Sequence, residues 1–251
     1  MSHDPAEPPI GRILPVDWAR TMALLAMAIF HAGRDFEVLG LVPPGTTFGG
    51  LWDLSARAIA STFLALAGVS LWLAHSRRLR WRAFLRRFLI LCAAAGAVSL
   101  ATWLFMPAIW VRFGILHSIA LASLLALPFL RLPWWIAAGV AAVILWIGPE
   151  ARHPAFNDWW WLWSGLSTEV PPMMDYEPMI PWLAPMLIGV AVGKLGTQLG
   201  IWNRLAGFPR DPGRFAELAA WPGRHSLAVY LIHQPVLIAV IAGGAWIAFR
   251  V

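Results

Sequence analysis

The chain has few charged residues and almost no cysteine. Only 13% of its 251 residues are charged and 59% are hydrophobic, which gives a mean hydropathy of +0.66. Soluble domains carry about 25% charged residues, so the composition excludes an ordinary soluble enzyme and predicts an integral membrane protein. The single cysteine, Cys92, excludes an intramolecular disulfide framework.

A cleavable signal peptide and internal repeats are also lacking. The opening residues, MSHDPAEPPIGR, are acidic and rich in proline, without the basic stretch and apolar core of a signal peptide. We therefore expect residues 1–15 to form a polar cytoplasmic segment that precedes a first helix acting as its own insertion signal. No period of about 20 to 50 residues recurs, which argues against a solenoid.

Tryptophan is abundant, with 17 residues against two tyrosines. Many tryptophans stand at the ends of apolar runs, as they do in the aromatic belts of membrane proteins. A membrane crossing needs about 20 mostly apolar residues. The sequence predicts a single all-α domain over residues 1–251, a bundle of about seven transmembrane helices. The predicted helices cover 16–33, 54–75, 86–106, 111–130, 132–149, 179–198 and 225–249.

The basic residues, 18 arginines and one lysine, predict the orientation of this bundle. Six arginines fall in 75–87, and Lys194 opens a second basic stretch over 194–224. Four predicted helices separate the two stretches, and cytoplasmic loops carry the excess of Lys and Arg. Both stretches are therefore expected inside, with the N-terminus cytoplasmic and the C-terminus periplasmic. The positive charge then reports topology, and no nucleic-acid partner is expected.

The predicted outer loops, 32–53, 106–110 and 150–178, hold eight of the 13 carboxylates. An acidic, tryptophan-rich outer face suits a polar or sugar-like acceptor, although solvated caps with tryptophan at the membrane interface explain most of the single residues better. Prolines at 178, 181 and 185 predict a broken helix entry that lines a cavity. Glycines at 189, 193 and 196 predict close helix packing behind it. The candidate substrate-binding residues beside this entry are Asp175, Glu177 and Trp182.

The first predicted helix carries ionisable residues at membrane depth. Such a residue costs about 2.5–3.5 kcal/mol at the centre of a spanning helix, so each one suggests a function. Arg20 and His31 are three turns apart and share one face, about 16 Å from each other. Asp35 follows one turn after His31 and is expected to accept a hydrogen bond from its imidazole, leaving the other nitrogen as base or nucleophile. The alternative is a snorkelling arginine and an interfacial histidine.

Two further predicted helices carry ionisable groups. Arg112 is expected near the outer surface, holding an oxyanion or a carboxylate such as Asp175 or Glu177, and His117 lies five residues deeper. Gly114 between them allows a neighbouring backbone or a ligand to approach closely. In the last predicted helix, Arg224 and His225 fall at the inner boundary. His233 falls near mid-membrane, where a simple packing role is an equal alternative.

Five segments, taken in order, resemble a known family. They are PVDWARTMALLAMAIFHAGRD (15–35), STFLALAGVSLWLA (61–74), RFGILHSIAL (112–121), DYEPMIPWLAPMLIGVAVG (175–193) and PGRHSLAVYLIHQPVL (222–237). Together they resemble the bacterial relatives of heparan-alpha-glucosaminide N-acetyltransferase. The interval from Arg20 to His31 also resembles that of the wider acyltransferase-3 group. Thr21 stands where the family has glycine, which weighs against close helix packing at that point.

The resemblance implies a membrane acyltransferase that moves acetyl from cytoplasmic acetyl-CoA to a sugar amine or hydroxyl on the far side. His31 would meet the thioester, and Arg112 or His117 would stabilise the oxyanion. No metal is expected. The implied catalytic residues are His31, Asp35, Arg112 and His117. The implied acetyl-CoA-binding residues are Arg20, Arg77, Arg78, Arg224, His225 and His233.

Two other functions remain open at this point. A proton-coupled transporter would relay protons through His31, His117 and His233, although many transporters are built from internal repeats that this chain lacks. A non-catalytic membrane scaffold would bind neither acetyl-CoA nor a solute. The expected partners of the acyltransferase are the lipid bilayer, a small-molecule acyl donor and a periplasmic glycan or sugar. The expected location is the bacterial inner membrane, and a homodimer is left open.

Overall fold

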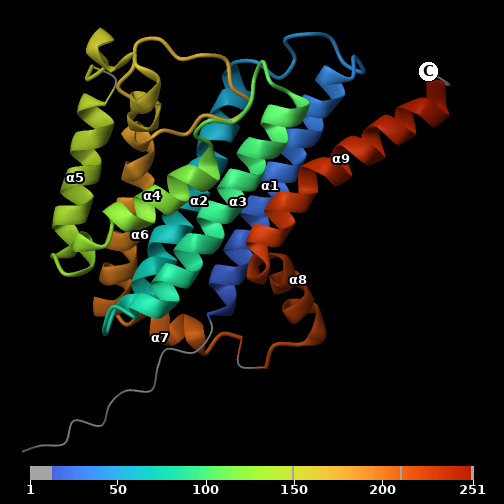
Figure 1. Ribbon diagram of the computed structural model, residues 1–251. Helices are drawn as coiled ribbons and strands as arrows, with labels where there is room; N and C mark the ends of the chain where they lie inside the picture. Colours follow the sequence, from blue (N-terminus) through green and yellow to red (C-terminus); the bar gives the residue numbers. More distant parts are fainter. Residues whose placement is uncertain (1–12, 149, 210, 250–251) are drawn as a thin grey trace, which may run out of the picture.

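The computed structural model describes residues 13–148, 150–209 and 211–249, and within these ranges the regular secondary structure is helical, with no strand. The all-α prediction is confirmed, and most of the polar segment predicted for 1–15 lies outside the described residues. The long helices of Figure 1 are α1 (Leu14–Val38), α2 (Gly50–His75), α3 (Trp81–Phe105), α6 (Met179–Gln198) and α9 (Ser226–Phe249). The shorter ones are α4 (Ile115–Leu125), α5 (Trp134–Ile147), α7 (Ile201–Ala206), α8 (Arg214–Arg224), η1 (Pro128–Leu130), η2 (Pro154–Phe156) and η3 (Trp159–Ser164).

The helices identify a multi-pass membrane protein. By length and composition, α2, α3, α6 and α9 are each able to cross a membrane. Helix α1 has 25 residues but carries charges near both of its ends. Each predicted window contains a helix, yet α4 has 11 residues and α5 has 14, too few to cross about 30 Å of hydrocarbon.

The prediction of one helix over 111–130 is therefore wrong. The chain is not helical between the end of α3 and Gly114. It also leaves the α-helix before Pro128, whose nitrogen has no hydrogen to continue the helical ladder.

Helices α2 and α6 pack together at the centre of the protein. A Cβ atom at Gly189 would lie 2.0 Å from the Ala65 carbonyl oxygen, and one at Gly68 would lie 2.2 Å from the Met186 carbonyl oxygen. The two backbones approach so closely because neither glycine has a side chain. The glycine packing predicted for 189–196 is confirmed. The main core lies where α2, α4, α5 and α6 meet.

Helix α1 lies on the other side of α2, between α2, α8 and α9. The Thr21 hydroxyl donates to the Ala219 carbonyl oxygen at 2.9 Å and accepts from the Gly223 nitrogen at 3.0 Å. A Cβ atom at Gly223 would lie 1.9 Å from the Asp17 carbonyl oxygen. Close packing therefore does occur at residue 21, because α8 supplies the glycine that α1 lacks.

The two ends of the bundle differ in charge. Helices α7 and α8 and the turn that follows α2 lie at the end where the arginine-rich stretches 75–87 and 194–224 gather, called here the basic end (Figure 1). The loops 39–49, 106–114 and 150–178 lie at the opposite end, called here the acidic end (Figure 1). The grouping of segments predicted from arginine counting is thus present in the fold.

Lys194 on α6 supports the fold. It is buried, and its Nζ donates to the carbonyl oxygens of Phe129 at 3.0 Å, Leu130 at 3.1 Å and Leu132. These carbonyl groups belong to the tight turn between α4 and α5, where helical partners are lacking. The lysine therefore fixes this turn to α6.

The contact between α2 and α6 predicts the effect of a single methyl group. Gly189→Ala is expected to destabilise the protein by about 1–3 kcal/mol, because the two backbones must separate to admit the methyl. The control is Gly96→Ala in α3, where an added Cβ would have nothing within 4 Å beyond the neighbouring backbone of its own helix. There alanine should be neutral or stabilise by up to about 1 kcal/mol. Thermal unfolding midpoints in detergent measure both, and equal midpoints for the two variants would contradict the packing.

Candidate functional site

A buried charge network lies at the basic end of α1. Asp17 is 3% exposed, and its carboxylate accepts from Arg20 at 2.8 Å and lies 3.6 Å from the Arg224 guanidinium. Arg20 also donates to the Ser70 hydroxyl on α2, and Arg224 pairs with Glu217 on α8. Pairing of this kind offsets the cost of removing charges from water. The network holds the guanidinium of Arg20 at one end of a cavity.

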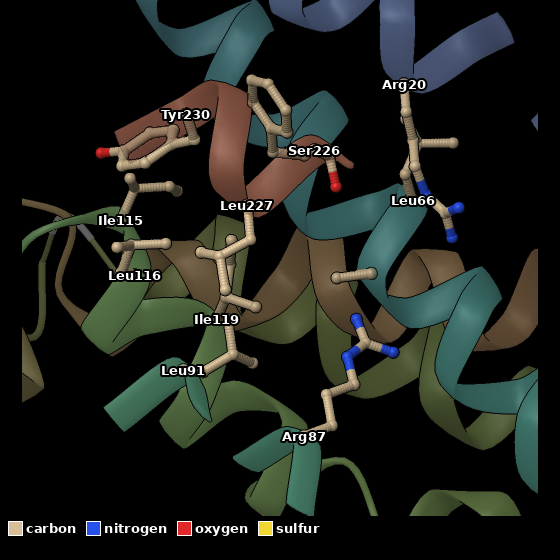
Figure 2. Close-up of a pocket in the computed structure, with 12 residues that line it drawn as sticks. Arg20, Leu66, Arg87, Leu91, Ile115, Leu116, Ile119, Ser226, Leu227 and Tyr230 are labelled. Atoms are coloured by element: carbon tan, nitrogen blue, oxygen red, sulfur yellow. The ribbon is translucent and has the colours of Figure 1, made fainter. Parts of the chain in front are cut away.

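This cavity, of about 90 Å³, extends from Arg20 to Tyr230. Figure 2 shows Arg20 from α1 and Arg87 from α3 reaching toward the same region, while the remaining walls are mostly apolar side chains of α2, α3, α4 and α9. A guanidinium only donates hydrogen bonds. The two positive charges repel each other, and an anion bound between them would offset this repulsion. Phosphate groups suit such a pair.

Two histidines lie beyond the Tyr230 end of the cavity. The Tyr230 ring is 5.6 Å, between centroids, from the His233 ring on α9, and the His233 ring is 5.0 Å from the His31 ring on α1. His31 and His233 were predicted to have separate roles. The structure brings them into contact at the point where α1 and α9 pack together.

Asp35 does not make the predicted hydrogen bond with His31. Its Oδ1 accepts from the Gln234 side-chain nitrogen at 2.7 Å, and its Oδ2 has no hydrogen-bond partner among the described residues. The prediction is wrong because the i,i+4 rule considers neighbours on one helix only, whereas the Asp35 carboxylate turns toward α9. Asp35 is nevertheless buried, with 6% of its surface exposed, directly beside the histidine pair.

The loop that precedes α6 places two carboxyl groups at the acidic end. Asp175 Oδ2 accepts from the Ile115 nitrogen at 2.8 Å and so caps the start of α4, where the absence of a side chain at Gly114 makes room for it. Burial raises the pKa of Asp175 to about 6. Burial and the charge of Asp175 raise the pKa of Glu177 to about 9, against the opposing charge of Arg57. Glu177 is therefore uncharged at neutral pH.

Arg112 and His117 lie near these carboxyl groups but pair with neither of them, and Arg112 Nη1 is buried without a hydrogen-bond partner among the described residues. Arg112 lies in the loop before α4, not on a helix as predicted, and its guanidinium stacks 4.9 Å from the Trp110 ring centre. The predicted pairing of Arg112 with a carboxylate is absent from the ion pairs of the described residues. The two ring nitrogens of His117 each lie 3.3 Å from a partner, the Gly114 nitrogen and the Ser99 hydroxyl.

The remaining predicted residues lie apart from the cavity lining. Arg77 and Arg78 are exposed in the turn after α2. His225 is exposed at the end of α8, with its ring 4.7 Å from that of Trp221. Trp182 packs on the core from α6.

Sequence reasoning missed the cavity residues Ser226 and Tyr230, and it covered Arg87 only as one of the arginines in the stretch 75–87 without singling it out. The spacing of apolar residues could have identified Arg87 as facing the protein interior. Phe84 and Leu91 lie three residues before and four residues after it, and both are buried. Among the described residues, no group of three His, Cys, Asp or Glu side chains is arranged to hold a metal ion.

Comparison with known proteins yields one match. No curated protein and no solved structure matches the chain. The family described as "Heparan-alpha-glucosaminide N-acetyltransferase, catalytic" matches over residues 12–235. The matched range runs from the start of α1 to Pro235 in α9 and contains the cavity and both histidines. The chain therefore belongs to the heparan-alpha-glucosaminide N-acetyltransferase catalytic family.

Proposed function

We propose that the chain is a membrane acetyltransferase that takes acetyl from acetyl-CoA at its basic end and delivers it to a sugar amine at its acidic end. One observation carries the proposal. A cavity with two arginines at one end reaches Tyr230 at the other, and Tyr230 contacts a pair of histidines. A family that includes an amine-acetylating enzyme supports the reaction type.

The cavity suits the separate parts of acetyl-CoA. Arg20 and Arg87 are placed to bind phosphate oxygens with charge-assisted hydrogen bonds. The apolar walls between them and Tyr230 suit the uncharged pantetheine arm. The thioester would then lie at the Tyr230 end, next to His233.

The histidine pair supplies a base for the transfer. The amine nitrogen attacks the thioester carbonyl carbon, the new C–N bond forms, and the C–S bond breaks. The amine gives up a proton to an imidazole, and the departing thiolate takes up a proton to become the free thiol. Two imidazolium charges at the 5.0 Å centroid separation of His31 and His233 would repel each other. The pair is therefore suited to hold one proton at a time.

The charge of the two ends supports a location and a direction. An arginine-rich end fits the cytoplasmic face of a membrane, which is where acetyl-CoA is made. We propose the bacterial inner membrane as the location, with the acidic end in the periplasm and a glycan or free amino sugar as acceptor. The carboxyl groups of loop 150–178 and of the adjoining ends of α1 and α2 suit a sugar that carries a positive amino group.

Binding of acetyl-CoA separates this proposal from its alternatives. At 100 times the dissociation constant, a ligand stabilises the folded protein by about 2.7 kcal/mol, so acetyl-CoA should raise the thermal unfolding midpoint of the purified protein. No shift at millimolar acetyl-CoA would contradict the proposal. Solute flux driven by a pH gradient in proteoliposomes, without such a shift, would indicate a transporter instead.

Arg87 provides a test of the donor site. Arg87→Gln removes a charge-assisted hydrogen bond to phosphate, so the KM for acetyl-CoA should rise about 10-fold to 100-fold with kcat within about twofold. Arg86→Gln is the matched control, because Arg86 is the adjacent arginine on α3 and, unlike Arg87, does not line the cavity. Steady-state kinetics with varied acetyl-CoA measure both. Equal effects of the two substitutions would exclude a specific role for Arg87.

His31 provides a test of the chemistry. His31→Ala should lower kcat for transfer by about 10²-fold to 10⁴-fold, the range expected for loss of a general base, while acetyl-CoA still raises the unfolding midpoint. His153→Ala is the control, because His153 is exposed in the loop at the acidic end. Release of free thiol and formation of acetylated sugar report the rate. Undiminished turnover of the His31 variant would remove this residue from the mechanism.

A further inference from the structure

Three polar atoms beside the histidine pair are buried without a partner. They are Asp35 Oδ2 on α1, and His233 Nε2 and Gln234 Oε1 on α9, and none of them has a hydrogen bond within the described part of the chain. Gln234 and Asp35 are joined by their 2.7 Å hydrogen bond, and His233 directly precedes Gln234 on α9. Buried polar groups normally find partners. Three such atoms in one place indicate that a ligand supplies the missing hydrogen bonds.

All three atoms act as acceptors. The nitrogen of the Gln234 amide is used in donating to Asp35 Oδ1, so the unpartnered end of the amide is its oxygen. The Nδ1 atom of His233 is hydrogen-bonded to the Tyr230 carbonyl oxygen. A carbonyl oxygen only accepts, so Nδ1 carries the hydrogen and Nε2 presents a lone pair. The Asp35 carboxylate contributes a negative charge to the same place.

The chemistry of this group selects its ligand. A primary ammonium has three N–H donors and a positive charge, which match three acceptors and one carboxylate. A hydroxyl offers one donor and no charge, and an anion would be repelled by Asp35. The other carboxyl groups at the acidic end match an ammonium less well. Asp175 is engaged in capping α4, and Glu177 is uncharged at neutral pH.

We propose that Asp35, Gln234 and His233 form an ammonium-binding subsite that holds the amino group of the acceptor beside His31. Asp35 and Gln234 position the nitrogen and favour an amine over a hydroxyl. One N–H then points to His233 Nε2, which holds the nitrogen beside His31, the base that takes the proton when the amine becomes a nucleophile. As an acceptor site, the subsite rests on the proposed acetyl transfer, but its affinity for an amine is measurable without acetyl-CoA.

The test compares glucosamine with glucose, which has a hydroxyl in place of the amine. In Asp35→Asn the side chain keeps its shape and loses its charge, so the KM for glucosamine should rise about 10-fold or more. The KM for acetyl-CoA should stay within about twofold, and any binding of glucose should be unchanged. Asp53→Asn, which alters an exposed carboxylate at the start of α2, is the control and should leave all three values unchanged.

Gln234→Leu is the second variant, because it removes the amide oxygen without changing the charge of the site. Like Asp35→Asn, it should raise the KM for glucosamine. If both variants raised the KM for glucosamine and the KM for acetyl-CoA by equal factors, the two residues would have a structural role, and the subsite would be overturned. An unchanged KM for glucosamine in both would overturn it as well.

Direct binding distinguishes failure of the subsite from failure of the proposed reaction. Stabilisation of the wild-type protein by glucosamine, lost in Asp35→Asn, supports the subsite even if acetyl-CoA neither binds nor reacts. That result would overturn the transferase proposal alone. Turnover of acetyl-CoA with glucosamine that is insensitive to both substitutions would overturn the subsite alone.

Discussion

The ion pair between Asp17 and Arg20 is the interaction on which the arrangement of the site depends. A charge at membrane depth is tolerated only inside the protein, paired with another group. Asp17 is buried against two guanidinium groups, and Arg20 also donates to Ser70 on α2. These pairs hold α1 against α2 and α8, and α1 also packs against α9. The packing of α1 on α9 brings His233 into contact with His31, so the charge network and the histidine pair lie at the two ends of one packed helix.

The features that the sequence predicted correctly are those that repeat along a single segment. Hydropathy located a helix in each of the seven windows, and small-residue spacing identified the close contact at Gly189. The shared face of Arg20 and His31 follows from helical geometry alone. The structure places Arg20 at the cavity and His31 beyond its far end. Such features need no knowledge of which helices are neighbours.

The features that the sequence missed depend on contacts between distant segments. Asp35 is hydrogen-bonded to Gln234, 199 residues away, and no periodicity within α1 reports that neighbour. The close contact at Thr21 arises because Gly223 lies on α8. Helix α4 is short because a non-helical loop precedes it and a proline follows it. Hydropathy reports the composition of a segment, so it does not locate the residue at which a helix starts. In each instance a tertiary contact or a backbone restriction outweighed a local pattern.

The hydrogen-bonding groups between Arg20 and His233 help to distinguish an acyltransferase from a proton-conducting transporter. Arg20 and Arg87 only donate hydrogen bonds, whereas the unpartnered atoms of Asp35, His233 and Gln234 only accept them. The two ends therefore suit ligands of opposite charge, an anionic donor and a cationic acceptor. A proton relay needs groups that both donate and accept in an unbroken series. The mostly apolar walls between the arginines and Tyr230 interrupt such a series, which favours transfer of a group carried by a bound substrate over conduction of protons.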